Sequence, residues 1–512
     1  MKNIGSIEHR KAAEDDRFFK DESKIGGGNA EEIFFPENEA EISAILKYCA
    51  EKKLKVTVAG GSTGITGAAV PFGGIVISME KFNKIIGLGF ENDHFFLKVG
   101  AAVTLSKIAE TLRTKDTSGF AELTENAIDL FNNSGHFWQY PVDPTEMSAQ
   151  IGGTAATNAS GAATYRFGPT RNWIKSLTVV LPDSSIRKIE RGKCFADEKG
   201  FFDFAGKKFA RPGYEMPHCK NAAGLYSKQG MDIIDLFIGS EGILGVISEL
   251  EIMLEKKEPA LSVVQFFSSD DEALLFVKKL KKSTLRPDFI EFIGESGISL
   301  IETRIKNGCM SLDIPEFGKN YRSAVFFDIA FDKNNSAALE KEVDELLEHP
   351  ENSWCAWENC ETERIKAFRH AVPESVNATI AEIKKKYPLV HKLGTDFAVS
   401  DEKFDELAAF YRQTLEKSGL RHAVFGHIGN NHLHINLLPS DYDELEKAKE
   451  TYALMAKKAL ELKGTVSAEH GIGKIKHKYL EMMFGTEGVD EMRRIKKVFD
   501  PDLILNNGNM FS

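Results

Sequence analysis

The sequence lacks the cysteine patterns that hold metal clusters or disulfide scaffolds. Its six cysteines in 512 residues include no Cys-x-x-Cys pair, and four residues separate the closest two. This spacing argues against an iron–sulfur module, a zinc ribbon or a disulfide framework within the chain. We therefore expect reduced thiols in a cytoplasmic protein. The positions are Cys49, Cys194, Cys219, Cys309, Cys355 and Cys360.

The sequence also lacks an apolar run typical of a membrane span. Residues 56–79 and 147–165 carry no charge, but glycine interrupts the first and small residues dominate the second. Neither approaches the hydrophobicity of a spanning helix. The first twenty residues mix both charge signs, so we expect neither a signal peptide nor a transit peptide. Any contact with the inner membrane is expected to be peripheral.

Positive charge is not in excess. Lys and Arg number 65 against 76 Asp and Glu, so the formal net charge is −11. This balance disfavours nucleic-acid binding, which needs a broad basic face. Apolar residues are 42% and charged residues 28%, as in ordinary soluble globular chains. The length predicts two to four domains, with small molecules or proteins as partners.

Periodicity predicts a first domain of α+β type over residues 1–255. An amphipathic helix is expected over 38–53, where apolar residues recur at spacings of three, four and seven, and another over 105–114. Apolar and β-branched segments predict strands at 54–60, 72–79, 94–101, 176–182, 184–190 and 244–254.

A charged segment with a proline, Glu255 to Pro259, marks the expected domain boundary. The pattern then restarts in a second domain over 256–465, which we expect to be an antiparallel sheet with helices on one face. Its strands are expected near 261–267, 323–331, 389–399 and 422–428, and two of its helices over 271–282 and 335–349.

Three glycine-rich runs indicate a ligand-binding surface. Residues 60–64 offer consecutive unhindered N–H groups and hydroxyls, as a pyrophosphate-binding nest requires. Alone, this run fits a tight turn between strands equally well, and it is neither a Walker loop nor a Rossmann fingerprint. Residues 151–161 and 238–247 supply two further runs. Three such runs suggest one extended dinucleotide.

The motifs AGGSTGITGAAVP, PVDPTEMSAQIGGTAATNASGAATYRFG and DLFIGSEGILGVISELEI resemble the FAD domain of the vanillyl-alcohol oxidase and p-cresol methylhydroxylase superfamily. The resemblance implies a two-subdomain FAD-binding domain of the p-cresol methylhydroxylase type. The first glycine loop contains no histidine, where several covalent members attach their flavin, so we expect non-covalent FAD. The FAD contacts that the resemblance implies are Gly60, Gly61, Ser62, Thr63, Gly64, Pro141, Gly153, Asn158, Gly161 and Ile247.

A histidine-rich segment, HAVFGHIGNNHLHINLLP, predicts a hairpin. Polar and apolar residues alternate after the turn, which places the polar set on one strand face. If Asn430 and Asn431 form a two-residue turn, His427 lies opposite His434, with Cβ atoms about 5 Å apart. Two imidazoles at that separation can share one divalent ion.

A further donor comes from the segment Glu469-His470-Gly471. A carboxylate beside two histidines suits zinc or manganese with open coordination positions. The spacing of these residues does not show that the two segments meet in space. By itself, the spacing favours a hydrogen-bonded hairpin and an unrelated loop.

The segments GHIGNNHLHIN and GTVSAEHGIGKIK resemble the C-terminal domain shared by flavin-linked D-lactate dehydrogenases, glycolate oxidase subunits and D-2-hydroxyglutarate dehydrogenases. With the FAD motifs, this resemblance covers nearly the whole chain. It implies His427, His434 and Glu469 as metal ligands and His470 as the base. It also implies Arg369 as a ligand of the substrate carboxylate, with Lys392 in a supporting position. Arginine suits that role because it binds carboxylates bidentately, although a lone helical arginine is more often a surface residue.

Two segments depart from the family pattern. Asn430-Asn431-His432 stands where relatives have Asp-Gly-Asn, which leaves the turn geometry and the role of His432 open. Residues 506–509, Asn-Asn-Gly-Asn, replace a common Asn-Pro-Gly-Lys. The segment 466–512 still fits a return to the flavin domain, with Asn506 available to the flavin ring.

The resemblance implies an FAD-dependent dehydrogenase that oxidises a D-2-hydroxy acid to its 2-oxo acid, with lactate the first candidate and glycolate or 2-hydroxyglutarate next. Hydride would pass from C2 to flavin N5 while His470 removes the hydroxyl proton, assisted by the ion. Electrons would then leave to a quinone, an electron-transfer flavoprotein, a cytochrome or an iron–sulfur subunit. A homodimer is a further expectation.

Three alternatives stay open at this point. One is another flavoenzyme of the superfamily, such as a sugar or alcohol oxidase or an ether-lipid synthase. Another is a metallohydrolase without flavin, and the last is a binding subunit without turnover.

Overall fold

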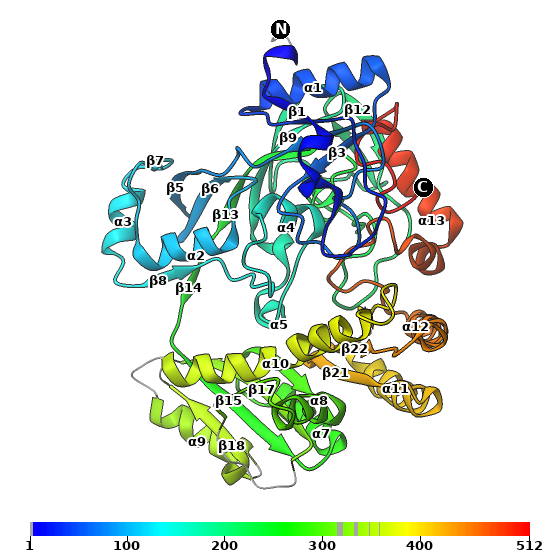
Figure 1. Cartoon of the computed structure of the whole chain (residues 1–512). Coiled ribbons are helices and arrows are strands. Elements are labelled where there is room, and N and C mark those ends of the chain that lie inside the picture. Colours follow the sequence, from blue (N-terminus) through cyan, green and yellow to red (C-terminus); the bar gives the residue numbers. More distant parts are fainter. Residues whose placement is uncertain (1–3, 315–320, 332–335, 348, 358) are drawn as a thin grey trace.

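The computed structural model describes residues 4–314, 321–331, 336–347, 349–357 and 359–512. They form two parts, one above the other in Figure 1, joined by the extended segment of β14 (Glu255–Lys257) and β15 (Ala260–Phe267). The C-terminal segment returns from the lower part to the upper one (Figure 1). Helices and sheets are mixed throughout, which confirms the α+β fold class.

A four-stranded sheet opens the first part. Its strand order is β1-β2-β4-β3, and β4 pairs in parallel with both β2 and β3. β2 and β3 therefore run parallel on either side of β4, and such strands need a crossover connection, which α1 (Glu39–Lys52) provides. The side chain of Asn38 caps this helix by accepting from the N–H of Glu41. The helix predicted over 38–53 is therefore confirmed. The strands are β1 (His9–Lys11), β2 (Glu32–Phe34), β3 (Val56–Ala59) and β4 (Ile75–Ser78).

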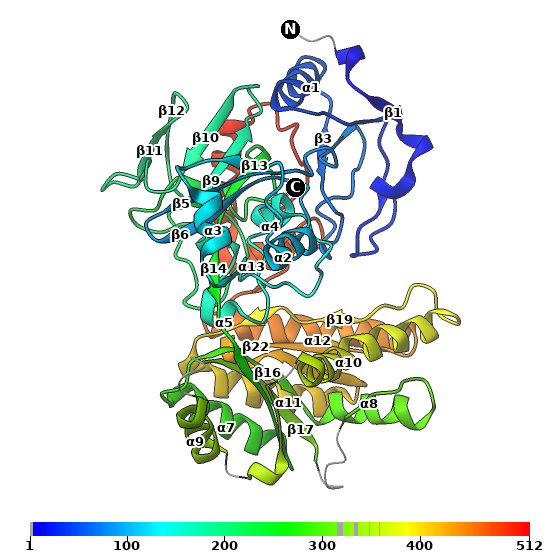
Figure 2. The same cartoon turned by 90° about the vertical axis from the view of Figure 1, so that its left-hand side faces the viewer.

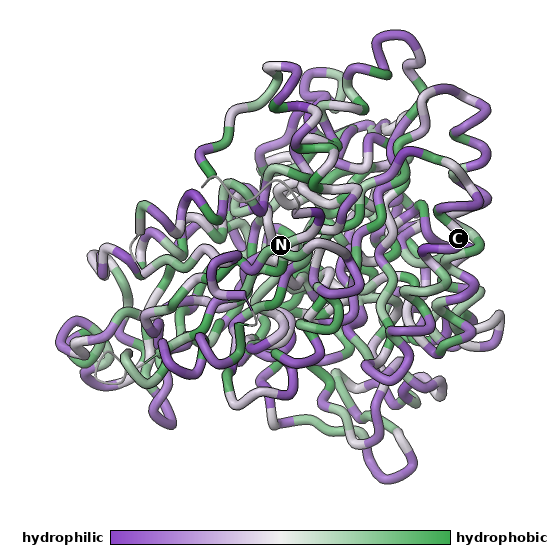
Figure 3. Tube along the Cα trace, turned by 90° about the horizontal axis from the view of Figure 1, so that it is seen from below, coloured by the Kyte–Doolittle hydropathy of each residue, from purple (hydrophilic) through white to green (hydrophobic). Residues whose placement is uncertain are grey.

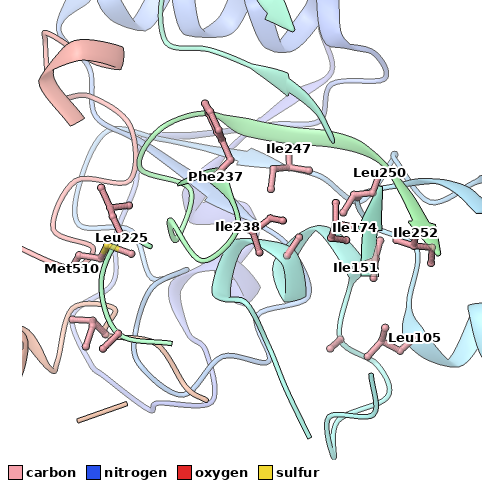
Figure 4. Packing of buried hydrophobic residues seen from close by; sticks show 14 of the residues in the cluster. Leu105, Ile151, Ile174, Leu225, Phe237, Ile238, Ile247, Leu250, Ile252 and Met510 are labelled. Carbon is pink, nitrogen blue, oxygen red and sulfur yellow. The ribbon is translucent and has the colours of Figure 1, made fainter. Parts of the chain in front are cut away.

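A six-stranded sheet completes the core of this part, with strand order β10-β9-β13-β6-β5-β7. Figure 4 shows Ile174 of β9 with Ile247, Leu250 and Ile252 of β13 in one buried cluster. The strands are β5 (Ile85–Glu91), β6 (His94–Gly100), β7 (Ala121–Glu122), β9 (Ile174–Val180), β10 (Ile186–Glu190) and β13 (Val246–Met253). Around it lie α2 (Leu105–Thr114), α3 (Ala127–Asn133), α4 (Ile151–Thr157), α5 (Thr164–Phe167), α6 (Ile234–Phe237) and the hairpin of β11 (Phe201–Phe204) and β12 (Lys207–Ala210).

The segment expected as a boundary is tied to both parts. β14 pairs with β8 (Phe137–Gln139) of the first part, and β15 enters the second sheet two residues after β14 ends. Arg166 on α5 contacts Glu258 at 3.0 Å and Asp288 of β16 (Pro287–Ile293) at 2.5 Å. These ion pairs hold α5 against the second part.

The second part is built on an antiparallel sheet of strand order β18-β15-β17-β16-β21-β22-β19, with β20 also paired to β22. The strand predicted over 389–399 is broken into two short pieces, β19 and β20. The remaining strands are β17 (Ser323–Ala330), β18 (Ser353–Ala356), β19 (Leu393–Gly394), β20 (Phe397–Ala398), β21 (His422–His427) and β22 (His432–Leu437).

Helices cover both faces of this sheet, so the prediction of helices on one face is wrong. Phe327 of β17 packs on Phe276 of α7 (ring centroids 5.9 Å apart), whereas Phe326 packs on Phe368 of α10 (5.3 Å). Successive strand residues point to opposite faces, so α7 and α10 lie on opposite sides. The continuous apolar runs of β15 and β17 are the sequence pattern of two-sided burial.

The helices of the second part complete the layers seen in Figure 2. They are α7 (Asp270–Lys282), α8 (Glu295–Lys306), α9 (Ser336–Leu346), α10 (Asn359–Lys384), α11 (Phe404–Ser418) and α12 (Tyr442–Glu461). The helix predicted over 335–349 includes positions 335 and 348, which lie outside the described residues.

The C-terminal segment joins the first part through α13 (His477–Phe499), which bends at the non-helical Gly485. Beyond it, the N–H of Val56 donates to Ile504 O, and the N–H of Asn506 donates to Val56 O, so the chain end extends beside β3. Seen from below, the tube trace has mostly hydrophobic stretches toward its middle and hydrophilic stretches along many outer turns (Figure 3). Within the described residues, no helix has the length and hydropathy needed to span a bilayer.

Candidate active site

The predicted hairpin forms, but in a different register. His427 pairs with His432, and Phe425 pairs with His434. The connection is a short 3-10 turn over Ile428–Asn430 followed by Asn431 in the left-handed region (φ +54°), rather than a two-residue turn. The prediction that His427 lies directly opposite His434 is therefore wrong. A shift of two residues preserves the face on which side chains lie, so the histidines still converge.

Glu469 meets the histidines in a buried cluster. Its carboxylate lies 3.1 Å from His427 Nε2 and 3.8 Å from His434 Nε2. One donor atom from each of His427, His432, His434 and Glu469 lies within 4.8 Å of all the others. Atoms bound to one zinc ion at about 2.0–2.1 Å are at most about 4.2 Å apart, so a small side-chain adjustment accommodates an ion. The donor set therefore fits a divalent metal.

Outer groups hold two of the histidines in place. Nδ1 of His427 lies 2.5 Å from Glu291 Oε1, and Nδ1 of His434 lies 3.3 Å from the backbone carbonyl of Thr395. A metal-bound histidine usually donates its second ring N–H to such an acceptor. This arrangement leaves Nε2 of both rings directed at Glu469.

Burial and charge perturb these groups strongly. Burial alone would lower the pKa of His427, but the carboxylates of Glu291 and Glu469 outweigh it and raise the pKa to about 9. Burial, reinforced by the neighbouring His432 and His427, lowers the pKa of His434 well below its usual value. Burial would raise the pKa of Glu469, yet His427 and Lys220 hold it well below the usual range. Such opposed shifts are typical of functional sites.

Asp396 holds the turn that carries His470. Its carboxylate lies 3.1 Å from His470 Nδ1 and 2.7 Å from Lys476 Nζ. Asp396 is fully buried, and despite that burial the His470 and Lys476 charges keep its pKa well below the usual value. Its further donors are the backbone N–H groups of Ala468, Glu469 and His470 and the hydroxyl of Ser467.

Lys220 is a site residue that the sequence reasoning missed. Its side chain is 4% exposed, and its ammonium group forms an ion pair with Glu469 and donates to Gly161 O at 3.3 Å. Ser160 donates to the same carboxylate at 3.3 Å. The glycine-rich run over 151–161 therefore borders the histidine cluster. A lone lysine has no periodic signature, so its role depends on a contact that only the fold creates.

The turn after His470 is anchored to the first part. Glu241 accepts from the N–H groups of Ile472 at 2.6 Å and Gly473 at 2.8 Å. Burial raises the pKa of Glu241, and these N–H groups oppose that rise. Next to it, Lys474 donates to Ala68 O at 3.0 Å, on the segment that follows the first glycine loop. His470 is thus fixed between the two parts of the molecule.

The first glycine loop is an open nest at the end of β3. Ser62 lies in the left-handed region (φ +53°), and a Cβ on Gly64 would meet no atom within 4 Å. Beside the loop, Gln150 Oε1 is buried without a hydrogen-bond partner and lies 3.2 Å from where a Cβ on Gly60 would be. The left-handed Ser62 and the open space at Gly64 fit a phosphate-bearing cofactor, and the orphaned Gln150 oxygen can accept a hydrogen bond from a donor group of such a cofactor. Gln150 was also missed.

The other glycine candidates differ in their surroundings. A Cβ on Gly153 of α4 would meet open space, as expected for a residue that faces a ligand. A Cβ on Gly161 would lie 2.1 Å from Asp143 O, so this glycine is required by close backbone packing. Pro141 is buried, and Ile247 is 8% exposed in the apolar cluster of Figure 4.

The two asparagine candidates are engaged within the protein. Asn158 Oδ1 accepts from the N–H of Arg171 at 3.0 Å. Asn506 Oδ1 accepts from the N–H of Val58 at 2.8 Å, and its Nδ2 donates to Glu241 O at 3.0 Å. Both side chains therefore shape the flavin-domain loops, and their contact with FAD stays a prediction.

Arg369 and Lys392 differ in burial and in their contacts. Arg369 stacks over the Phe289 ring at 4.7 Å, and its Nη1 is buried with no hydrogen-bond partner among the described residues. Its charge also acts on Glu291, which bonds to His427. Lys392 is exposed and donates to Asn377 at 2.8 Å. The supporting role of Lys392 stays a prediction.

Comparisons with known proteins cover both parts of the chain. The family model for the FAD binding domain matches residues 30–123 and 132–190, and that for the C-terminal domain of FAD linked oxidases matches residues 256–510. D-lactate dehydrogenase from Anaerostipes hadrus is 27% identical, over 96% of this chain and 92% of its own length. Glycolate oxidase subunit GlcD from Bacillus subtilis is 27% identical, over 94% and 88%.

Two further comparisons extend this result. D-2-hydroxyglutarate dehydrogenase from Xanthomonas citri pv. viticola is 26% identical, over 94% of this chain and 89% of its own. A solved structure of alkyldihydroxyacetonephosphate synthase superposes with a TM-score of 0.61 at 14% identity, over 94% of this chain and 76% of that one, which shows a shared fold. The chain therefore belongs to the FAD-linked oxidase family and is an FAD-linked oxidoreductase.

Proposed function

We propose that the protein is a metal-assisted, FAD-dependent dehydrogenase of a D-2-hydroxy acid, with D-lactate as the first candidate substrate. One observation carries the proposal. The turn bearing Glu469 and His470 is fixed by Asp396 of the second part and by Glu241 of the flavin domain. This arrangement supports the proposal because it holds His470, as a proton acceptor, between the second part and the flavin domain.

FAD would be held non-covalently by the first glycine loop and by the runs near Gly153 and Ile247. The bound flavin supplies the acceptor for the hydride that leaves C2 of the substrate. Small residues in these runs allow the backbone to approach a large planar cofactor. No histidine in the loop is available for covalent attachment.

A divalent ion, zinc or manganese, would be held by His427, His434 and Glu469. Such an ion polarises the substrate hydroxyl and lowers its pKa. Glu291 keeps Nδ1 of His427 occupied, so its Nε2 is directed inward. The ion pair between Lys220 and Glu469 compensates the buried carboxylate, so these ligands are preorganised.

His470 would accept the hydroxyl proton at Nε2. Asp396 accepts at Nδ1 and thereby selects the tautomer whose Nε2 carries the free lone pair. The rings of His470 and His434 are stacked with centroids 5.7 Å apart, which places the base beside the metal ligands.

Arg369 would bind the substrate carboxylate. Its buried Nη1 has no partner among the described residues, so its N–H groups can donate to a substrate carboxylate. Guanidinium groups bind carboxylates bidentately. Lys392 would act beside it in a weaker, supporting role. Reduced flavin would pass its electrons to a separate carrier, because the chain has no Cys-x-x-Cys cluster module.

An anaerobic titration tests this function. Purified holoprotein is mixed with D and L forms of lactate and 2-hydroxyglutarate, with glycolate, and with a sugar and an alcohol, while flavin absorbance is followed. Bleaching by D-2-hydroxy acids in preference to the L forms supports the proposal. Bleaching only by sugars or alcohols favours another flavoenzyme of the superfamily, and no bleaching by any compound contradicts the proposal.

A further inference from the structure

His432 occupies an unusual position in the histidine cluster. It is fully buried, at 0% exposure; its Nδ1 has no hydrogen-bond partner within the part of the chain that the structure describes, and its Nε2 lies 3.3 Å from Asp396 Oδ1. A buried polar group without a hydrogen-bond partner destabilises the folded protein. Such a group requires an explanation, and an unfilled ligand role is one.

The hairpin register directs His432 at the proposed metal ligands. It pairs directly with His427, and the two rings have centroids 5.5 Å apart. The ring of His434, two residues along the same face, is 4.4 Å away. A donor atom of His432 lies within 4.8 Å of donors from His427, His434 and Glu469. No other histidine joins this group among the described residues.

We propose that His432 is a fourth protein ligand, which makes the site a three-histidine, one-carboxylate centre. This inference rests on the proposed metal site and extends it. One ring nitrogen of each histidine has an acceptor beside it: Glu291 beside His427 Nδ1, the Thr395 carbonyl beside His434 Nδ1, and Asp396 Oδ1 at 3.3 Å from His432 Nε2. A shared pattern of outer acceptors is expected when all three rings bind one ion.

A fourth protein ligand restricts which metal ions could bind here and still leave a coordination position for a substrate. A tetrahedral zinc site would be filled by His427, His432, His434 and Glu469, and no position would remain for a substrate. An ion that accepts five or six ligands, such as Mn²⁺, keeps one or two positions open. We therefore expect this chain to work with a divalent ion of coordination number above four.

The test compares wild-type holoprotein with His432→Asn and His432→Gln. His422→Gln is the matched control, because His422 lies on β21 of the same hairpin outside the cluster. Each protein is stripped of metal, loaded with Mn²⁺ or Co²⁺, and checked for bound FAD and thermal unfolding. Metal affinity is measured by competition with a chelator. Pulsed EPR of the Mn²⁺ form counts the bound imidazoles, and the Co²⁺ absorption bands report the coordination number.

The expected result is three imidazoles in the wild type and His422→Gln, and two in His432→Asn. Loss of an outer hydrogen-bond partner already costs about 10–100-fold in metal affinity, so both His432 variants should lose at least that much while FAD stays bound. Two imidazoles in the wild type, or unchanged affinity and spectra in folded His432→Asn, would overturn the inference. Failure to bind any metal would overturn it as well. Flavin bleaching by hydroxy acids is measured separately, so the proposed dehydrogenase function can stand or fail independently.

Discussion

Replacing Asp396 by asparagine tests how the site orients its base. The buried Asp396 carboxylate lies 3.1 Å from His470 Nδ1 and 2.7 Å from Lys476 Nζ. Asparagine keeps the size of the side chain, but its amide group can donate where a carboxylate only accepts. A donor facing Nδ1 would move the ring proton to Nε2. The nitrogen that should receive the substrate proton would then be blocked.

The expected effects are large because this pair is buried. Loss of a positioned general base typically lowers the rate by about 10²–10⁴-fold, and Asp396→Asn should approach that range. Lys476 would also lose its counter-charge, and breaking a buried pair costs about 3–5 kcal/mol of unfolding free energy. The pKa of Asp396 lies well below its usual value of 3.8. The ionised carboxylate therefore contributes its full stability above about pH 4, and the difference from the variant shrinks as pH falls toward the depressed pKa.

The rate is measured by anaerobic stopped-flow reduction of the flavin, and stability by urea unfolding across pH. Lys476→Met separates the two effects, since it removes the buried charge partner but leaves Asp396 beside His470. It should lose stability while its folded fraction reduces flavin within a few-fold of the wild-type rate. Asp401→Asn, on the same segment but with an exposed side chain, is the control. Folded, FAD-loaded Asp396→Asn with a near-native reduction rate would refute the reasoning.

Three further predictions follow from the cofactor, metal and substrate assignments. Acid precipitation should release the yellow chromophore into the supernatant, and flavin retained on the polypeptide would contradict non-covalent binding. His427→Ala and Glu469→Gln should each lose metal in elemental analysis while keeping stoichiometric FAD. Unchanged metal content in both variants would contradict the proposed metal site. Arg369→Leu should raise KM for a carboxylate substrate about 10- to 100-fold, since a hydrogen bond to a charged group is worth about 1.5–3 kcal/mol. An unchanged KM would exclude Arg369 from substrate binding.

Local patterns predicted much of the fold. The helices α1 and α2 and the strands β3, β6 and β9 lie where periodicity placed them, because their apolar spacing is set by the geometry of a single element. The helix layers of the second part were predicted less well. Val264 and Phe326 face one layer, and Val263 and Phe327 face the other. Which helix covers which face depends on how distant elements pack, and no local spacing records it.

The candidate site also combines features that local sequence predicts with features that depend on how distant segments pack. The alternation of His432 and His434 fixed their face, but the hairpin register depended on Asn431 adopting a left-handed conformation after a 3-10 turn. Lys220 could not be found from the sequence, because its partner Glu469 is 249 residues away. Asp396 was missed for a similar reason, since it lies 74 residues before His470.

The most direct test of the account is the reduction of enzyme-bound flavin by a single enantiomer of a 2-hydroxy acid without oxygen. D-lactate or another D-2-hydroxy acid should bleach the oxidised flavin band completely, and the L form should bleach it much more slowly. The matching 2-oxo acid should form in equal amount to the flavin reduced. Equal rates for both enantiomers, or flavin that stays oxidised with every hydroxy acid, would contradict it.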